Sequence, residues 1–438
     1  MDWRFLIEGK EALNVTTDSR KIVPDCVFVA LKGEHFDGND FVAQAFRQGA
    51  AWALMEDRDK YALLSEEDQR RTTLPAEGGT GIGLIQDLAR AWRRELGLPI
   101  LGITGTNGKT TTKELCAAVL STKYNLYYTQ GNLNNQLGVP LTLLSITRAH
   151  EMAIVEMGAS HPGDIKELVE IAEPNYGLIT NVGKAHLQGF GSFEGVKRTK
   201  AELYDFLIAH GGLIFRNADN PHLEEMLEES RKTAAELLKV ERPQPEAAQR
   251  PINVILYHTG LMPEGTHLVG GYNAENVSAA ICVGEYFGVS EEAALAAIRA
   301  YVPSNNRSQL MQTERNTIVI DAYNANPTSM TAAIEAFDQY QISNVPSQMP
   351  KAYILGAMRE LGEYSHLEHQ NIVNMLLERK AEGVLLVGAE YQETTAPYPV
   401  FDDVEALCQH LEQEPLSGYR ILLKGSRSNQ LEKVIPYL

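Results

Sequence analysis

A short apolar run that leads directly into a glycine-rich turn constrains the fold more than any other feature of the sequence. Residues 100–104 (ILGIT) predict a strand, and the following GTNGKTTTKEL places Gly105, Gly108, Lys109 and Thr110 where a helix begins. Glycines let the backbone curl so that its amides point inward, and the helix N-terminus adds a positive dipole. A lysine can neutralise phosphate charge, and a threonine hydroxyl can ligate magnesium. The turn therefore predicts a nucleotide phosphate site within an α/β sheet.

This turn departs from the commonest phosphate-loop pattern at one position. The pattern GxxxxGK[ST] needs glycine at position 103, where this chain has Ile103, so the match is to the shorter form GTNGKTT. The alternative interpretation is a glycine-rich turn with a solvent-facing lysine, and the flanking strand and helix argue against it. The turn by itself fits a kinase, a GTPase, a motor or a ligase.

Strand and helix patterns alternate on both sides of the turn, which indicates mainly parallel sheets covered by helices. Further apolar runs lie at residues 151–159, 176–183, 211–217, 317–323, 352–358, 383–389 and 419–425. A helix over 84–96 would end at Gly97, and the polar stretch SNNRSQ follows Pro303. The acidic and proline-containing stretch 223–251 predicts an exposed helix followed by a loop.

These patterns predict an α/β fold with three domains. Residues 1–98 would form a small α/β domain, and residues 99–303 a central parallel-sheet domain that carries the phosphate loop. Residues 304–438 would form a C-terminal Rossmann-like α/β domain.

Charge and cysteine content exclude several classes of function. The chain has 57 acidic and 39 basic residues, a net charge of −18, which disfavours nucleic acid and anionic membranes as partners. An anionic substrate would need locally placed cations or backbone amides. The four cysteines form no metal-binding or disulfide pattern. The sequence shows neither a leader segment nor a long apolar run, so we expect a cytoplasmic protein.

Two polar residues follow neighbouring apolar runs in the central domain. Glu156 ends the strand expected within the run 151–159, and His186 follows the run 176–183. Both are therefore expected above the phosphate turn, where they could share magnesium with Thr110. Histidine is an unusual magnesium ligand, and a loop histidine bonded to backbone is an equal alternative for His186. For Glu156 the alternative is a carboxylate exposed to water. Lys197 and Lys200 fall on one helix face, which is typical of a solvated basic patch.

A series of motifs along the whole chain resembles the Mur ligase family, the ATP-dependent amide-forming enzymes of peptidoglycan precursor synthesis. The motifs occur in family order: TDSR at 17–20, GTNGKTT at 105–111, GNLNNQLGVP at 131–140, EMGAS at 156–160, TNVGKAHL at 180–187, TKAEL at 199–203, GGYNAEN at 270–276 and KGSR at 424–427. DAYNANPTSM at 321–330 and LGAMRELGEYSHLEH at 355–369 resemble the members that add D-alanyl-D-alanine to a UDP-N-acetylmuramoyl tripeptide. The DNPR-type motif of the tripeptide-forming members is not found.

The resemblance implies roles for individual residues around ATP and two magnesium ions. The ATP phosphates would bind Gly105, Thr106, Asn107, Gly108, Lys109, Thr110 and Thr111. One magnesium would bind Thr110 and Glu156, His186 would belong to the metal site, and Lys200 as a carbamate would help to hold the second ion. Asn273 would contact adenine, Arg307 the γ-phosphate and Asp321 the ribose. Lys109, Glu156, His186, Lys200 and Arg307 would thus form the catalytic group.

The resemblance also implies where the other substrates bind. Ser19 and Arg20 would receive the uridine nucleotide in the first domain, and Asn134 and Asn135 would lie near the muramoyl end. Asn324, Asn326, Lys424 and Arg427 are the candidates for the peptide substrates, with Lys424 and Arg427 on the dipeptide carboxylate. Local sequence alone would make Asp321 a turn cap and Arg307 a solvated hinge residue.

The implied reaction joins a carboxylate to an amine through an acyl phosphate, with domain closure excluding water. Within the superfamily the competing interpretation is folylpolyglutamate synthase, against which TDSR and DAYNANP argue. From another class, a nucleotide-hydrolysing switch with a protein partner is the alternative. We expect a monomer; the third residue of the tripeptide is not readable from the sequence.

Overall fold

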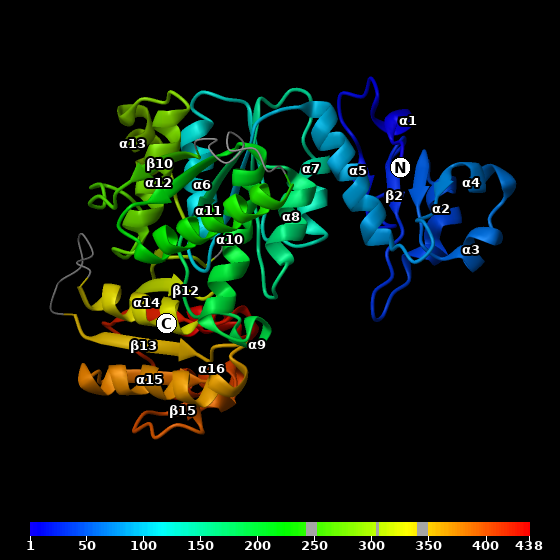
Figure 1. The fold of residues 1–438 in the computed structure, drawn as a ribbon. Helices are drawn as coiled ribbons and strands as arrows, with labels where there is room; N and C mark the ends of the chain where they lie inside the picture. The colour runs from blue at the N-terminus through cyan, green and yellow to red at the C-terminus, as the bar shows by residue number, and fades with distance from the viewer. Residues whose placement is uncertain (242–251, 304–305, 340–348) are drawn as a thin grey trace.

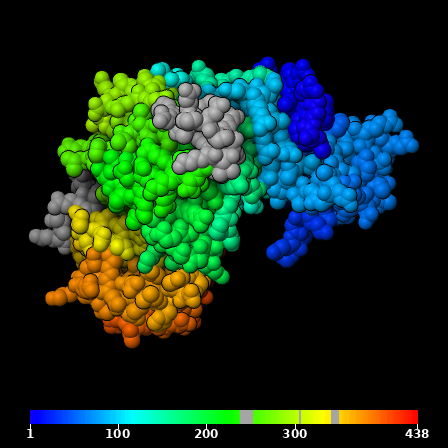
Figure 2. Space-filling model, viewed as in Figure 1, coloured from blue at the N-terminus to red at the C-terminus, as the bar shows by residue number. Residues whose placement is uncertain are grey.

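The protein is described by a computed structural model that covers residues 1–241, 252–303, 306–339 and 349–438. It consists of three α/β domains, each built on its own sheet. Figure 1 shows the central domain between the other two. In Figure 2 the N-terminal domain projects from the central domain and stands apart from the C-terminal one. The predicted α/β class with three domains is therefore confirmed.

The N-terminal domain has a four-stranded parallel sheet in the order β1-β2-β3-β4. Its strands are β1 (Val15–Thr16), β2 (Val27–Val29), β3 (Trp52–Leu54) and β4 (Thr72–Thr73). Its helices are α1 (Arg4–Ile7), the 3-10 helix η1 (Gly38–Phe41), α2 (Val42–Arg47), α3 (Arg58–Ala62) and α4 (Glu66–Arg70). The small α/β domain predicted for the first part of the chain is thus present.

Helix α5 (Gly81–Leu96) joins the first domain to the second. The Thr80 hydroxyl caps it by accepting a hydrogen bond from the Gly83 amide (3.1 Å), and Gly97 ends it in the left-handed region at φ +64°. Its buried side chains, among them Leu88 and Trp92, pack with α7 and α8 of the central domain. The predicted helix 84–96 is confirmed, and it begins three residues earlier.

The central domain has a six-stranded parallel sheet in the order β10-β9-β8-β5-β7-β6. The strands are β5 (Ile100–Thr104), β6 (Leu126–Tyr128), β7 (Met152–Glu156), β8 (Tyr176–Ile179), β9 (Leu213–Asn217) and β10 (Asn253–Tyr257). The helices are α6 (Lys109–Leu120), α7 (Gly138–Leu144), α8 (Asp164–Ala172), α9 (Leu187–Phe190), α10 (Phe193–His210), α11 (Pro221–Glu241), α12 (Asn273–Tyr286) and α13 (Glu291–Ala300). Apolar cores fill both faces of the sheet, one under α5, α8 and α10 and the other under α6, α12 and α13.

The C-terminal domain has a six-stranded sheet in the order β11-β12-β16-β13-β14-β15, parallel except for the edge strand β11. The strands are β11 (Gln309–Gln312), β12 (Thr317–Asp321), β13 (Lys351–Gly356), β14 (Gly383–Val387), β15 (Val400–Phe401) and β16 (Arg420–Lys424). The helices are α14 (Pro327–Gln339), α15 (Ser365–Glu378) and α16 (Val404–Gln413), with 3-10 helices η3 (Gly362–Tyr364), η4 (Ala389–Tyr391), η5 (Arg427–Asn429) and η6 (Leu431–Tyr437). The four predicted strands of this domain are confirmed.

Two sequence predictions are met only in part. The predicted exposed helix at 223–251 is present as α11, but one of its faces is buried through Leu223, Met226 and Leu227. The predicted loop over 242–251, and residues 304–305 of the polar connector, lie outside the described residues.

Among the described residues, no helix has the length and apolar character needed to cross a membrane.

Candidate active site

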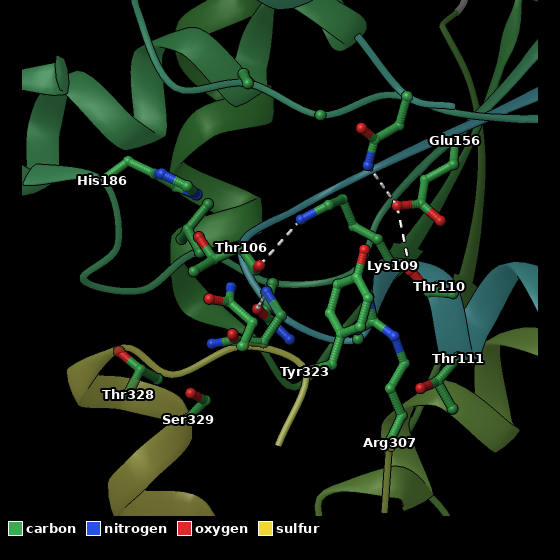
Figure 3. Close-up of a pocket in the computed structure, with 18 of the residues that line it drawn as sticks. Thr106, Lys109, Thr110, Thr111, Glu156, His186, Arg307, Tyr323, Thr328 and Ser329 are labelled. Carbon is green, nitrogen blue, oxygen red and sulfur yellow. Dashed lines mark hydrogen bonds between the residues drawn. The ribbon is translucent and has the colours of Figure 1, made fainter. Parts of the chain in front are cut away.

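A cavity of about 870 Å³ lies between the central and C-terminal domains, where β5, β7 and β8 end. The central domain contributes the phosphate turn, Glu156 and His186, and the C-terminal domain contributes Asp321 and Tyr323. In Figure 3 the Tyr323 ring of the C-terminal domain lies beside Lys109 of the phosphate turn. The carboxyl end of a parallel sheet is the usual place for a ligand in such folds, so the chain topology itself positions this site.

The phosphate turn has the shape that its glycines predict. Gly105 and Gly108 have φ angles of +143° and +79°. A Cβ atom would lie 2.0 Å from the Thr180 hydroxyl at Gly105 and 2.4 Å from the Asn276 amide oxygen at Gly108, so glycine is required at both positions. The Thr180 hydroxyl holds the turn by donating a hydrogen bond to the Asn107 carbonyl (2.6 Å). Asn181 also holds it by accepting the Thr106 and Asn107 amides at 2.9 and 3.0 Å.

Lys109 is folded back onto its own turn. Its Nζ donates hydrogen bonds to the carbonyls of Gly105 (2.8 Å) and Thr106 (3.1 Å). Burial lowers the pKa of Lys109, the Glu156 charge opposes that shift, and the Arg307 charge adds to it. Lys109 is therefore a buried cation whose bonds to neutral carbonyls could be exchanged for stronger bonds to phosphate oxygens.

Glu156 is buried at the end of β7, with 1% of its surface exposed. Its Oε1 accepts hydrogen bonds from the Thr110 hydroxyl (3.2 Å) and the Asn134 amide (2.8 Å). Its Oε2 is buried and has no hydrogen-bond partner among the described residues, although Lys113 Nζ lies 3.9 Å away. The alternative of a carboxylate exposed to water is therefore wrong. A buried free carboxylate oxygen beside a threonine hydroxyl is a donor set that fits magnesium.

His186 lies at the cavity edge in the left-handed region, at φ +51°. Its Nδ1 is in contact with the carboxylate of Glu360, a cavity residue from the C-terminal domain. Burial lowers the pKa of His186, and the Glu360 charge opposes that shift. The described part of the chain contains no group of three or more histidine, cysteine, aspartate or glutamate residues arranged for a metal. A metal here would thus depend on Glu156, Thr110 and ligands of other kinds.

Lys197 and Lys200 lie on α10, and the prediction of a solvated basic patch is wrong for both. Lys197 is 3% exposed and donates to Glu225 on α11 (2.7 Å). Lys200 is 2% exposed, and no acidic side chain among the described residues forms an ion pair with its amine. Burial, with the Lys109 charge as a smaller cause, holds the pKa of Lys200 well below its usual range. Burial therefore favours the uncharged form of the Lys200 amine, whereas Lys197 is paired with glutamate.

Asp321 and Lys424 form a buried ion pair between neighbouring strands of the C-terminal domain. The two residues lie opposite each other in the β12–β16 register. Lys424 Nζ donates to Asp321 Oδ2 (2.7 Å) and to the Asn324 carbonyl (3.0 Å), and the lysine is 1% exposed. Lys424 also lines the cavity, and its assignment to the dipeptide carboxylate stays a prediction.

Two other residues predicted for the ATP site, Arg307 and Asn273, both line the cavity but differ in their contacts. Arg307 lines the cavity, and its guanidinium carbon lies 3.8 Å from the centre of the Tyr323 ring, so it is not simply a solvated hinge residue. Asn273 is buried at the cavity wall, where its amide donates to the Val269 carbonyl (2.8 Å) and accepts from Asn276 (2.9 Å). Both polar atoms of the Asn273 side chain are thus already used.

The two domains are joined by polar contacts around the cavity. Asn326 donates to the Asn107 side chain at 2.8 Å, which links the C-terminal domain directly to the phosphate turn. Lys184 donates through its backbone amide to the Thr328 hydroxyl (3.0 Å) and through its ammonium to Glu368 (2.8 Å). These contacts hold the central and C-terminal domains together around the cavity.

The predicted residues for the other substrates lie at different distances from this cavity. Asn134 and Asn135 line it, and Asn135 also accepts the Gly138 amide at the start of α7 (2.8 Å). Asn324 lines it from the C-terminal domain. Ser19 and Arg20 lie in the N-terminal domain, outside the cavity wall, and Arg20 pairs with Asp18 (2.8 Å).

Sequence reasoning missed several cavity residues, among them Tyr323 and Glu360. These two lie in segments that were quoted only as family motifs, and neither received a role. A signal was available, because Tyr323 ends one predicted apolar run and Glu360 comes shortly after another. Polar or aromatic residues just beyond the carboxyl ends of parallel strands are candidates for the ligand site.

Comparisons with known proteins agree with these observations along the whole chain. Three domain families match: "Mur ligase family, catalytic domain" at residues 12–77, "Mur ligase middle domain" at 103–284 and "Mur ligase, glutamate ligase domain" at 306–427. The UDP-N-acetylmuramoyl-tripeptide–D-alanyl-D-alanine ligases of Bacillus subtilis and Escherichia coli are each 34% identical, over 96% of this chain and 92% of their own length.

Solved structures show the same likeness. MurF from Acinetobacter baumannii superposes with a TM-score of 0.79 at 27% identity, covering 97% of this chain and 92% of that one. MurF ligase from Thermotoga maritima, in complex with ADP, superposes with a TM-score of 0.80 at 25% identity, covering 98% of both chains.

Proposed function

This chain belongs to the Mur ligase family, and on that basis we propose that it joins D-alanyl-D-alanine to a UDP-N-acetylmuramoyl tripeptide. The products are the UDP-N-acetylmuramoyl pentapeptide, ADP and phosphate. One structural observation carries the proposal: the phosphate turn with Lys109 and the buried Glu156 faces Arg307 and Asp321 across the closed interdomain cavity. Such an arrangement provides phosphate binding, charge stabilisation and exclusion of water at one place.

The phosphate turn is proposed to bind ATP. The turn from Gly105 to Thr111 would hold the phosphate oxygens at the start of α6, chiefly through the amides of the first helical turn. The amides of Thr106 and Asn107 are bonded to Asn181, so these two residues would shape the turn around the phosphates. Lys109 would exchange its bonds to the Gly105 and Thr106 carbonyls for the β- and γ-phosphates. That the similar Thermotoga maritima ligase was solved with ADP supports this assignment. Arg307 is assigned to the γ-phosphate.

The nucleoside end of ATP is proposed to lie toward Asn273 and Asp321. Asp321 Oδ1 accepts the Ser308 amide at 3.4 Å, a long contact that leaves capacity for a ribose hydroxyl. Asn273 would meet adenine along the cavity wall, and its two internal hydrogen bonds would have to rearrange or be shared.

Magnesium is proposed to bind beside the phosphate turn. The free Oε2 of Glu156 and the Thr110 hydroxyl fit one ion, and His186, released from Glu360, is the further candidate. A Lys200 carbamate is proposed to help hold a second ion, and burial of Lys200, which lowers the pKa of its amine, favours the uncharged form that reacts with carbon dioxide. When bound, magnesium would withdraw charge from the phosphate oxygens and so make the γ-phosphorus more open to attack.

The reaction then needs two displacements in a site closed to water. The terminal carboxylate of the tripeptide attacks the γ-phosphorus and ADP leaves, while Lys109 and Arg307 stabilise the charge on the transferred group. The dipeptide amine then attacks the carbonyl carbon of the acyl phosphate and loses a proton. The bond between that carbon and the bridging oxygen breaks, and phosphate leaves with the oxygen. The interdomain contacts at Asn107–Asn326 and Lys184–Glu368 keep the site closed against hydrolysis of this intermediate.

The other substrates are proposed to approach from the two outer domains. Ser19 and Arg20 would bind the uridine nucleotide, and Asn134 and Asn135 would receive the muramoyl end. Asn324, Asn326, Lys424 and Arg427 of the C-terminal domain are the candidates for the dipeptide.

We further propose that residues 1–98, 99–303 and 304–438 are the three folding units, and that the protein works as a cytoplasmic monomer. The cytoplasmic assignment is supported by the proposed dependence on ATP and a UDP-linked precursor. Neither nucleic acid nor a membrane is assigned as a partner, in keeping with the net charge of −18.

Phosphate release by the purified protein with ATP and magnesium tests this function. The assay is run with UDP-N-acetylmuramoyl tripeptide, with D-alanyl-D-alanine, with both, and with folate plus glutamate. We expect release only with both peptide substrates. Lys109→Met should abolish it, whereas Lys232→Met on the exposed surface of α11 should not. Release that is independent of both substrates would overturn the proposal in favour of a regulatory nucleotide hydrolase.

A further inference from the structure

The Arg307 side chain is held against an aromatic ring from the C-terminal domain. Tyr323 lies two residues beyond the end of β12, and its ring centre is 3.8 Å from the Arg307 guanidinium carbon. Figure 3 shows the Tyr323 ring beside Arg307 and close to the phosphate turn. A guanidinium within about 6 Å of a ring centre is attracted to the ring face. A second cation, the Arg427 guanidinium, lies 5.6 Å from the same ring centre.

The backbone around Arg307 is fixed independently of its side chain. Asn306 and Ser308, on either side, have φ angles of +57° and +47°, a region that non-glycine residues seldom adopt. The Ser308 hydroxyl is hydrogen-bonded to the Tyr272 hydroxyl of the central domain (2.7 Å), and its amide donates to Asp321 of the C-terminal domain. These contacts fix where the Arg307 side chain starts, but not where its long, flexible end lies.

The end of that side chain points toward the phosphate turn. Arg307 and Lys109 line the same cavity, and the Arg307 charge helps to lower the pKa of Lys109, after burial. Two cations that repel each other in a cavity will separate unless each is held. Lys109 is held by the carbonyls of Gly105 and Thr106, and the ring of Tyr323 is the corresponding support for Arg307.

We propose that Tyr323 is a positioning residue whose ring face holds the Arg307 guanidinium at the phosphate turn, ready for the transferred phosphoryl group. This inference rests on the proposed function, because it needs Arg307 to act on ATP. It predicts that the aromatic face matters and that the hydroxyl does not. It also predicts that Tyr323 affects the rate of phosphoryl transfer, not the binding of a nucleotide that lacks the γ-phosphate.

Steady-state kinetics with conservative and non-conservative replacements test the first point. Tyr323→Leu should lower kcat about tenfold, the size expected for loss of one such contact, with KM for the UDP-tripeptide unchanged. Tyr323→Phe should retain most of the activity because it keeps the ring. Tyr323→Met serves as a second aliphatic variant of similar volume, and Tyr286→Leu, at a partly exposed tyrosine on α12, is the matched control. Equal losses in the Phe and Leu variants would overturn the inference.

A double-mutant cycle with Arg307 and a binding measurement test the second point. In an Arg307→Ala background, Tyr323→Leu should cause no further loss of kcat, and by calorimetry ADP affinity should match that of the unmodified protein. The same tenfold loss in both backgrounds, or a parallel fall in ADP affinity, would overturn the inference, because the ring would then act on the nucleotide itself. Failure of the proposed function is distinguishable, since the unmodified protein would then make no pentapeptide.

Discussion

Replacing Lys424 by methionine should destabilise the C-terminal sheet and weaken nucleotide binding together. Lys424 and Asp321 are opposite each other on β16 and β12, and the lysine is fully enclosed. Removal of one partner from a buried pair costs about 3 to 5 kcal/mol because the other charge is left without compensation. The Asp321 side chain is 18% exposed, so water recovers part of this, and we take the lower end, about 3 kcal/mol. Methionine keeps the aliphatic packing of the lysine, so the loss reports the charge.

Hydrogen exchange with mass spectrometry measures this effect where it occurs. Peptides covering Thr317–Asp321 and Arg420–Lys424 should exchange about a hundredfold faster in Lys424→Met, since each 1.4 kcal/mol corresponds to about tenfold. The double variant Asp321→Asn/Lys424→Met should recover most of the protection, because no charge remains buried. Unchanged exchange in Lys424→Met, or a double variant less protected than the single one, would refute the reasoning.

Three further changes should have separable effects. Arg307→Ala should lower kcat about a thousandfold, by analogy with other phosphate-facing arginines. The affinity for the UDP-tripeptide, measured by calorimetry, should stay within about twofold of that of the unmodified protein. Unchanged turnover would contradict the role assigned to domain closure. Glu156→Gln should raise the magnesium concentration needed for half-maximal ATP binding about tenfold or more. The reason is that this change removes the only free carboxylate oxygen found beside Thr110 in the described structure. An unchanged magnesium titration would show that Glu156 does not belong to the metal site. Lys60 lowers the pKa of Asp37 to about 2, below the ordinary 3.8, so the stability from this pair is present above about pH 4 and lost as the pH falls toward 2. Lys60→Met should therefore destabilise the N-terminal domain slightly at pH 7 and progressively less below pH 4, in urea unfolding followed by tryptophan fluorescence; a loss that does not change with pH would contradict the pairing.

The phosphate turn could be predicted from the sequence because everything that shapes it is contiguous. The strand Ile100–Thr104, the two glycines and the first turn of α6 follow one another, and the left-handed φ at Gly108 is a local requirement. The end of α5 was equally local, since Gly97 provides its cap, whereas the start was predicted three residues too late because the Thr80 cap was overlooked. Local chemistry of this kind is visible in a single chain.

Burial of charged residues could not be predicted in the same way. Lys197 and Lys200 have the spacing of a solvated helix face, and only the packing of α10 against α8 and α11 encloses them. The ion pair of Lys424 depends on the sheet order, in which β16 inserts between β12 and β13. That crossover is set by the tertiary fold, so nothing in the sequence indicated that Lys424 would pair with Asp321.

The roles around ATP could be assigned only by resemblance, because they join distant segments. Arg307 and Tyr323 meet through the return of the chain along β11 and β12, and Asn107 meets Asn326 across the domain interface. Periodicity and spacing carry no record of such contacts. The family motifs supplied the assignments for Arg307 and Asp321, and they missed Tyr323, whose ring lies against the Arg307 guanidinium.

The most direct test of the proposed chemistry follows oxygen from substrate to product. The UDP-tripeptide is prepared with ¹⁸O in both oxygens of the carboxylate that forms the amide, and the reaction is run with ATP, magnesium and D-alanyl-D-alanine. Carboxylate activation by ATP predicts one ¹⁸O in the released phosphate and one in the new amide carbonyl, by mass spectrometry. Phosphate that carries only oxygen from ATP and water would contradict an acyl phosphate and with it the proposed ligase mechanism.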